Sequence, residues 1–260
     1  MVTRVMQRAV WVVPIALILT GCGRQVSQES PRDRSLSATG LQRRTEPTAR
    51  AVVAAAFEAA GGLAAWEQCR KIEFRATVTA CEGDGCFYLT EHDFVLSPWA
   101  NAIQVAAREP RASFTWQVAH GRPRGPQVDW SLDVSPLRDL SCDYADAVLQ
   151  IVTAPVRMLE DPVSLKPAPT ATRMAGQWYL PIDARYQARK AGPREKPAPP
   201  HWTLGIYFQS QDRSVVDALW LGNPDTRKYI LVRGYDYAPD AGNSVLIPTK
   251  IEMFQSDPQA

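Results

Sequence analysis

Apolar and polar residues alternate along most of this chain, and this alternation is the feature that most limits its fold. From Lys71 to Ala80 every second residue is apolar, and a strand with that period presents one apolar and one polar face. We therefore predict about ten short antiparallel strands, separated by clusters of Gly, Pro, Asn and Asp. The remaining strand-like segments are 112–118, 128–134, 178–184, 202–208, 215–221, 229–237 and 245–254.

Two helical regions interrupt the strands. Thr48–Ala60 is rich in alanine and ends at Gly61-Gly62, and a second helical turn spans Leu63–Cys69. In a later helix, which Pro155 bends or divides, the apolar residues form one stripe. One-sided strands need a partner layer, so we predict an α+β fold in which a strongly curved antiparallel sheet, a half-barrel, is lidded by helices. The stripe consists of Tyr144, Val148, Ile151, Val152, Val156 and Leu159.

The first 21 residues predict export. Arg4 and Arg8 precede the apolar run Ala9–Thr20, which as a helix of twelve residues would rise about 18 Å, too little to cross a bilayer. A basic start followed by a short apolar stretch is typical of a cleaved secretory signal. Removing two of the 29 basic residues leaves 27 against 27 acidic ones, and a neutral chain has no electrostatic reason to bind nucleic acid.

The apolar run ends in Leu19-Thr20-Gly21-Cys22, which resembles the lipobox of bacterial lipoproteins. The resemblance implies that residues 1–21 are the signal peptide, that Cys22 becomes the lipidated first residue, and that the chain is anchored to a membrane. Gly23 favours the outer membrane of a diderm bacterium, facing the periplasm. Residues 22–47 then form a polar tether, and 48–260 form the folded domain. The alternative is an ordinary cleaved signal with a coincidental cysteine.

Four further cysteines favour disulfides, because even numbers in exported chains usually pair. Cys81 and Cys86 flank a Gly-rich turn, so we predict that they pair, which leaves Cys69 with Cys142 by elimination. The competing interpretation is a zinc site. The four cysteines are separated by 11, 4 and 55 residues, whereas structural zinc usually takes closely paired ligands.

Two segments are similar to the LolA/LolB-like outer-membrane lipoprotein carriers and their envelope relatives. They are Ala59–Trp66, which leads into a strand at Ile72–Phe74, and the C-terminal Tyr235–Glu252. The resemblance covers most of Thr48–Phe254. It implies an incomplete, curved antiparallel barrel that is lidded by helices and holds acyl chains in an apolar cavity. A lipid anchor and disulfides depart from the soluble carriers of that family.

The resemblance and the alternation together predict the residues that line such a cavity. Their alternative role is to fill an ordinary core. The sequence thus favours a non-enzymatic, lipid-anchored protein that binds an acyl chain. The alternatives are an envelope scaffold or interaction module with a filled core and, less favoured, a hydrolase acting on envelope material. The candidate lining residues are Phe74, Val78, Phe114, Trp116, Trp130, Trp202, Leu204, Ile206 and Phe208.

The chain has no nucleotide-binding, nucleophile-elbow or zinc-protease motif, and we predict no catalytic residue, metal or cofactor. Glu91-His92-Asp93 contains acid and base groups, but a strand points His92 away from both neighbours. His120 and His201 have no partner visible in the sequence. The predicted partners are a membrane and a lipid, with no nucleic acid; protein partners stay open.

Overall fold

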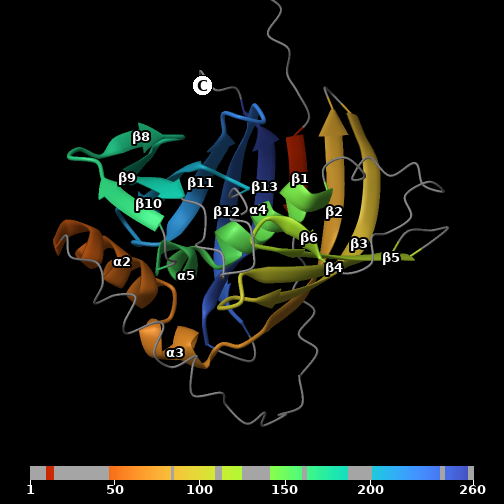
Figure 1. The fold of residues 1–260 in the computed structure, drawn as a ribbon, viewed down its shortest axis with the longest axis horizontal. Helices are drawn as coiled ribbons and strands as arrows, with labels where there is room; N and C mark the ends of the chain where they lie inside the picture. The colour runs from red at the N-terminus through yellow and green to blue at the C-terminus, as the bar shows by residue number, and fades with distance from the viewer. Residues whose placement is uncertain are drawn as a thin grey trace, which may run out of the picture.

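The computed structural model (Figure 1) describes residues 10–14, 47–82, 85–108, 113–124, 141–159, 163–186, 201–240 and 244–256. These residues form one sheet of 13 strands, accompanied by helices. The helices are α2 (Pro47–Ala59), α3 (Leu63–Gln68), α4 (Ser141–Val152) and α5 (Ala154–Leu159). The strands are β1 (Val10–Pro14), β2 (Ile72–Glu82), β3 (Gly85–Ser97), β4 (Ala102–Arg108), β5 (Ser113–Ala119), β6 (Arg122–Arg124), β7 (Val163–Pro167), β8 (Thr172–Met174), β9 (Gln177–Tyr186), β10 (Leu204–Ser210), β11 (Val216–Asn223), β12 (Lys228–Pro239) and β13 (Leu246–Gln255).

The strand order divides the sheet into an N-terminal and a C-terminal half. The order is β6-β5-β4-β3-β2-β1-β13-β12-β11-β10-β9-β7, and β8 pairs with β9 beside this path. Every pair is antiparallel. Figure 1 shows the two halves curving around the helical segment α4–α5. The predicted α+β fold, a curved antiparallel half-barrel with helices, is confirmed.

The N-terminal half of the sheet follows the predicted alternation. On β2 the side chains of Ile72, Phe74, Ala76 and Val78 are buried, and the residues between them are less buried or exposed. Strand β4 was not predicted, because alanines weaken its apolar signal. Its burial nevertheless alternates in the same way, with Ile103, Val105 and Ala107 on the inner face.

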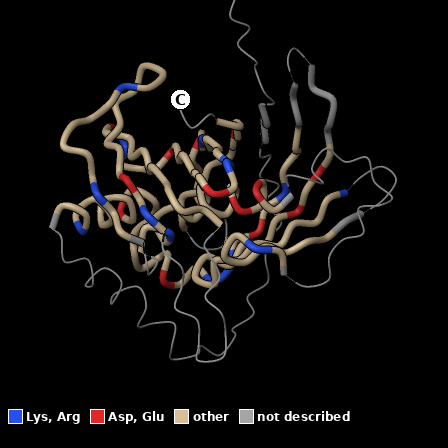
Figure 2. The backbone as a smooth tube through the Cα atoms, turned by 45° about the horizontal axis from the view of Figure 1, so that its top comes forward, with Lys and Arg blue, Asp and Glu red and all other residues tan. Residues whose placement is uncertain are grey.

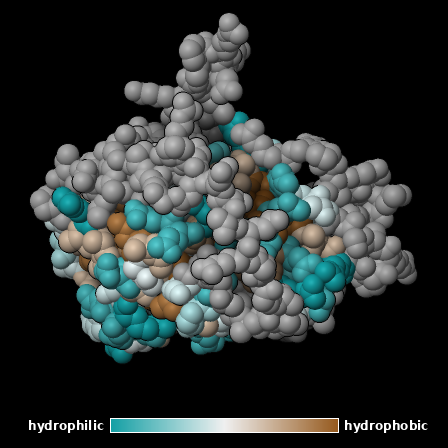
Figure 3. Space-filling view, turned by 90° about the horizontal axis from the view of Figure 1, so that it is seen from below, coloured by the Kyte–Doolittle hydropathy of each residue, from teal (hydrophilic) through white to brown (hydrophobic). Residues whose placement is uncertain are grey.

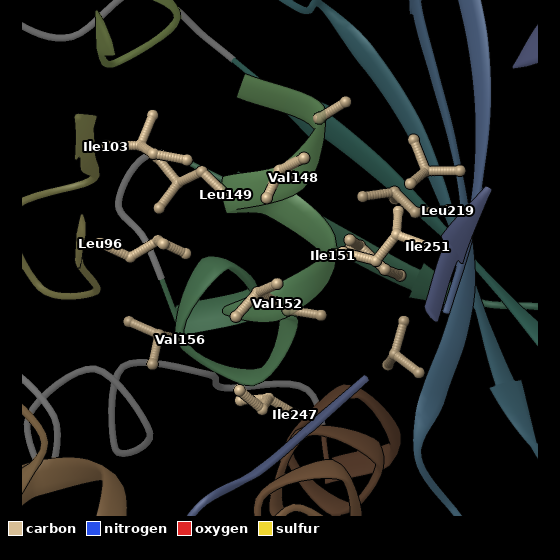
Figure 4. Packing of buried hydrophobic residues seen from close by; sticks show 14 of the residues in the cluster. Leu96, Ile103, Val148, Leu149, Ile151, Val152, Val156, Leu219, Ile247 and Ile251 are labelled. Carbon is tan, nitrogen blue, oxygen red and sulfur yellow. The ribbon is translucent and has the colours of Figure 1, made fainter. Parts of the chain in front are cut away.

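Helices α4 and α5 run through the interior. All residues from Asp143 to Leu159 are buried, including the polar ones. Figure 4 shows α4 between Leu96 and Ile103 of the N-terminal half and Leu219 and Ile251 of the C-terminal half. The predicted apolar stripe therefore packs on both halves of the sheet, and the helix occupies the space that the sheet encloses.

Helices α2 and α3 meet at a glycine turn that the C-terminal segment closes. Gly61 has a φ of +105°, and a Cβ atom there would lie 2.5 Å from the carbonyl oxygen of Ser244, so only glycine fits. The Leu246 amide donates to the Ala60 carbonyl at 3.0 Å, and Trp66 Nε1 donates to the same carbonyl at 3.0 Å. The turn thus joins the start of the domain to the strand that ends it.

The structure contains a strand inside the predicted signal of residues 1–21. In the full chain Val10–Pro14 forms strand β1 between β2 and β13. Three of its five residues are valine and one is tryptophan, and such residues favour strands. In this structure the segment joins the two halves of the sheet, and its removal as a signal stays a prediction.

The predicted disulfide between Cys69 and Cys142 is wrong, since both residues carry free thiols. Cys69 caps the end of α3 and donates to the Lys71 carbonyl at 3.8 Å, whereas Cys142 lies in α4 and donates to the Gly121 carbonyl at 3.4 Å. The two thiols have different neighbours. The side chains of Cys81 and Cys86 lie outside those that the structure describes.

The described surface mixes both signs of charge. In Figure 2 basic and acidic residues are interspersed along the described backbone. Figure 3 shows apolar residues between hydrophilic ones on the face seen from below. Among the described residues, no helix combines the length and the apolar character needed to cross a bilayer.

Candidate functional site: the interior around α4

Four of the predicted lining residues lie together in the interior. Phe74 and Val78 on β2, Trp116 on β5 and Trp202 just before β10 are all buried in the same apolar cluster. Phe74 stacks on Phe94 of β3, with ring centroids 4.8 Å apart. These residues line the concave side of the sheet that faces α4.

The prediction for β10 had the wrong phase. Leu204, Ile206 and Phe208 are only partly buried, whereas Tyr207 between them is fully buried. Trp202 precedes the strand and does not share its alternation. The Tyr207 hydroxyl lies 2.6 Å from that of Tyr186. This hydrogen bond lets Tyr207 be buried, although its polar hydroxyl favours an outward position when only the sequence is considered.

Two further candidates cannot be assigned to the interior. The side chain of Phe114 lies outside the described side chains, and Trp130 lies outside the described residues. For Trp116, on the same strand as Phe114, the predicted inward orientation holds, because its side chain is 8% exposed.

His92 lies at the centre of an aromatic group in the N-terminal half. Its ring centroid is 5.9 Å from that of Phe94, 5.8 Å from that of Trp116 and 5.7 Å from that of Tyr144. The Nδ1 atom lies 3.2 Å from the Tyr144 hydroxyl, and Nε2 has no hydrogen-bond partner among the described residues. Burial lowers the pKa of His92 to about 4, so the imidazole is neutral at pH 7.

The predicted opposition of His92 to its neighbours is confirmed. His92 points inward, while Asp93 on the other face accepts from Arg75 Nε at 2.6 Å and lies 2.7 Å from Arg108. His92 therefore cannot form an acid–base pair with the adjacent carboxylates. Its surroundings are those of a neutral hydrogen-bonding group in an apolar interior.

A stripe of buried polar residues follows one side of α4 and α5. It is interspersed with the apolar stripe in sequence, and its spacing places it on a single helix face. Buried polar groups require partners, so this face determines which segments α4 contacts. The stripe consists of Asp143, Asp146, Gln150, Thr153 and Arg157.

Asp143 ties the start of α4 to the C-terminal half of the sheet. Its Oδ2 accepts from Lys228 Nζ at 2.8 Å, and its Oδ1 lies 2.8 Å from His201 Nε2. Burial disfavours the charged carboxylate, but the hydrogen bonds from His201 and Lys228 outweigh it and lower the pKa of Asp143. The carboxylate is thus a charged anchor between α4 and β12.

Asp146 lies one turn further along. Its Oδ2 accepts from Trp202 Nε1 at 2.6 Å, which fixes the predicted lining residue Trp202 against the helix. Complete burial raises the pKa of Asp146, although His201, Trp202, Gln150 and Arg157 act in the opposite direction. Farther along, Arg157 of α5 donates to the Pro98 carbonyl.

Sequence reasoning missed this polar set. His201 is paired with an aspartate 58 positions earlier, and Lys228 with the same residue across 85 positions. No local motif reports pairs so far apart. The periodicity of the acidic residues on α4 was the one signal available, because charges on the buried side of a helix require distant partners.

The cysteine and acid groups near α4 do not form an activated nucleophile. Burial, together with Asp146 and Asp143, raises the pKa of Cys142 to about 12, so its thiol is protonated at neutral pH. A cysteine nucleophile acts as the thiolate. Within the described ranges, no group of three or more His, Cys, Asp and Glu side chains is placed to hold a metal ion.

Comparisons with known proteins give weak likenesses. No family model matches the sequence, and no curated protein does. A LolA superfamily protein from Nitrosomonas europaea is similar in structure with a TM-score of 0.39 and 9% identity, covering 80% of this chain and 91% of that one. A DUF1329 family protein from Desulfovibrio piger has a TM-score of 0.33 and 8% identity, covering 88% of this chain and 91% of that one. At these scores the likenesses assign neither a family nor a function.

Proposed function

We propose that this protein is a non-enzymatic cell-envelope lipoprotein, anchored through Cys22, that binds an acyl chain between the concave face of its sheet and α4. The observation that supports this proposal is the apolar lining, which comes from strands of both halves and faces the apolar stripe of α4 (Figure 4). We place the protein at the outer membrane, facing the periplasm, because of the lipobox-like sequence before Cys22 and the glycine after it.

The energetics favour a long apolar ligand. Each methylene removed from water contributes about 0.8 kcal/mol. A chain that inserts beside α4 would lie between the apolar lining of the sheet, which includes Trp116 and Val78, and the apolar stripe of the helix. Asp143 and Asp146 hold the N-terminal part of α4 through hydrogen bonds to Lys228 and Trp202, and the apolar stripe of the helix is buried along its whole length.

The second candidate is an envelope scaffold with a filled core. It is favoured by the complete burial of α4 and α5, since all residues from Asp143 to Leu159 are inaccessible to solvent or nearly so. On this alternative the interior serves stability, and the partners bind elsewhere. The two candidates therefore differ in whether the interior takes up lipid.

Native mass spectrometry of the protein, purified from membranes in mild detergent, separates the two. Acyl-chain binding predicts an adduct of lipid mass, beyond the covalent anchor, that organic solvent removes. Trp116→Ala enlarges the lined space and should shift the bound lipids towards longer or branched chains. Trp178→Ala is the matched control, because Trp178 is 51% exposed on β9. Consistent absence of an adduct from a folded protein favours the scaffold.

A further inference from the structure

Strand β1 joins the two halves of the sheet. Its five residues, Val10–Pro14, lie opposite Lys250–Phe254 of β13, and its first three also lie opposite Thr79–Cys81 of β2. Because β1 is antiparallel to both neighbours, β2 and β13 run parallel to each other. The described residues contain no other strand between them in the sheet order.

Removal of the leader would vacate this position. The inference rests on the proposed function here, since β1 lies inside the predicted signal of residues 1–21. Processing would leave unpaired backbone donors and acceptors on two facing edges, one on β2 and one on β13. With strands about 4.8 Å apart, the vacated space is about 10 Å wide, the width of one strand with its two ladders.

The two edges do not simply close on each other, because the interior holds them apart. The side chains of α4 fill the space between Leu96 and Ile103 on one half and Leu219 and Ile251 on the other (Figure 4). Direct closure would move the halves together by about one strand spacing against this packed core. It would also create a parallel pair, with a different hydrogen-bond pattern, in a sheet that is otherwise antiparallel.

The two faces of the vacated position differ in polarity. At the Trp11 and Val13 positions the opposing residues on β13 are Met253 and Ile251, which are 5% and 1% exposed. At the Val12 position the opposing residues are Glu252 and Thr79, which are partly exposed. An occupant therefore needs apolar residues at alternate positions and can carry polar ones between them.

We propose that in the processed protein the space between β2 and β13 binds an extended peptide segment of a partner protein, which adds as an antiparallel strand to both edges. Main-chain hydrogen bonds supply affinity, and the apolar inner positions supply specificity. In the structure the segment Val10–Pro14 occupies this position, so it shows which residues fit there: β-branched and aromatic residues in an extended segment. In the precursor the leader blocks the site, so processing opens it.

The test uses the processed protein and a fluorescein-labelled peptide of residues 9–15 extended by two lysines, with anisotropy as the readout. Saturable binding is expected. Val13→Lys in the peptide, opposite Ile251, should weaken binding at least about tenfold, because it would bury a charge. Val12→Lys, opposite Glu252, is the matched control and should change the affinity by less than about threefold.

Hydrogen exchange gives a second readout on the edges. Amides of 79–81 and 250–254 that face the vacated space should exchange rapidly in the processed protein and slowly once the peptide is bound. Protection before any peptide is added means that the halves have closed, which overturns the proposal. Absence of peptide binding, or equal weakening by both lysine substitutions, also overturns it.

The outcomes are separable from those of the proposed function. The intact mass shows whether the leader has been removed and whether Cys22 carries lipid. If the leader is retained, processing cannot open the site, and the proposal is wrong. A lipid adduct reports interior binding independently of the peptide. If added fatty acid displaces the peptide competitively, the space belongs to an acyl chain and the peptide assignment is wrong.

Discussion

The fold places a neutral imidazole where the apolar core allows no charge. Protonation of His92 in the folded chain puts a cation among Phe94, Trp116 and Tyr144, with Asp93 on the other face of the strand giving only partial compensation. The unfolded chain binds this proton near pH 6.5, but the folded chain binds it only near pH 4. Falling pH across this window therefore favours unfolding.

As the pH falls from 7 to 4, we expect the titration of His92 to lower the free energy of unfolding by about 3 kcal/mol. His92→Phe should flatten this part of the pH profile, as measured by urea denaturation at several pH values. His120→Asn is the control, because His120 lies in a turn with a φ of +52°, which asparagine tolerates. Parallel profiles for His92→Phe and the wild type would contradict the assignment.

Gly121 supports the partner of Asp143. Its φ is +69°, and a Cβ atom there would lie 2.1 Å from the Cβ of His201. Gly121→Ala should therefore displace His201 as well as strain the backbone, lowering the stability by at least about 2 kcal/mol. Gly176→Ala isolates the backbone contribution, since Gly176 has a φ of +86° and no atom within 4 Å of a built Cβ. Equal losses in denaturation experiments would show that contact with His201 is unimportant.

At the scale of the element, the β2–β3 hairpin keeps one disulfide prediction open. Cys81 lies directly opposite Cys86 in the strand register, and opposed residues of antiparallel strands have Cα separations that suit a disulfide. Non-reducing peptide mapping should find this pair. Cys69 and Cys142 should react with iodoacetamide only after unfolding, because burial raises both thiol pKa values to about 12. A peptide joining Cys69 to Cys142 would refute this pattern.

Strands were predictable where alternation was strong, and their orientation was predictable where one face was clearly more apolar. The β2 and β5 assignments follow from this. On β10 the more apolar residues are only partly buried, because the Tyr207 hydroxyl pairs with that of Tyr186 and Tyr207 can occupy the interior. The apolar stripe of α4 was visible too, but its burial on all sides was not. That depends on Lys228 and His201, which only the completed fold brings to Asp143.

At the scale of the whole molecule, the membrane attachment is the main untested prediction. Cys22→Ser removes the sulfur that would carry lipid, so the protein should move from the membrane pellet to the soluble fraction after cell breakage, with the domain still folded. Cys142→Ser is the matched control and should stay in the pellet. Unchanged partitioning of Cys22→Ser would show that anchoring does not depend on a lipid at this residue.

A helix enclosed on every side also constrains the order in which the protein can fold. In the chain, α4 follows the strands of the N-terminal half and precedes those of the C-terminal half. Its Asp143 can accept a hydrogen bond from Lys228 only after 85 more residues have been synthesised. The Gln209 amide likewise donates to the Val52 carbonyl across 157 residues. Such distant contacts make folding slow. The nascent chain must therefore keep one side of α4 uncovered until the strands of the C-terminal half have been synthesised, and during that interval it depends on protection from aggregation.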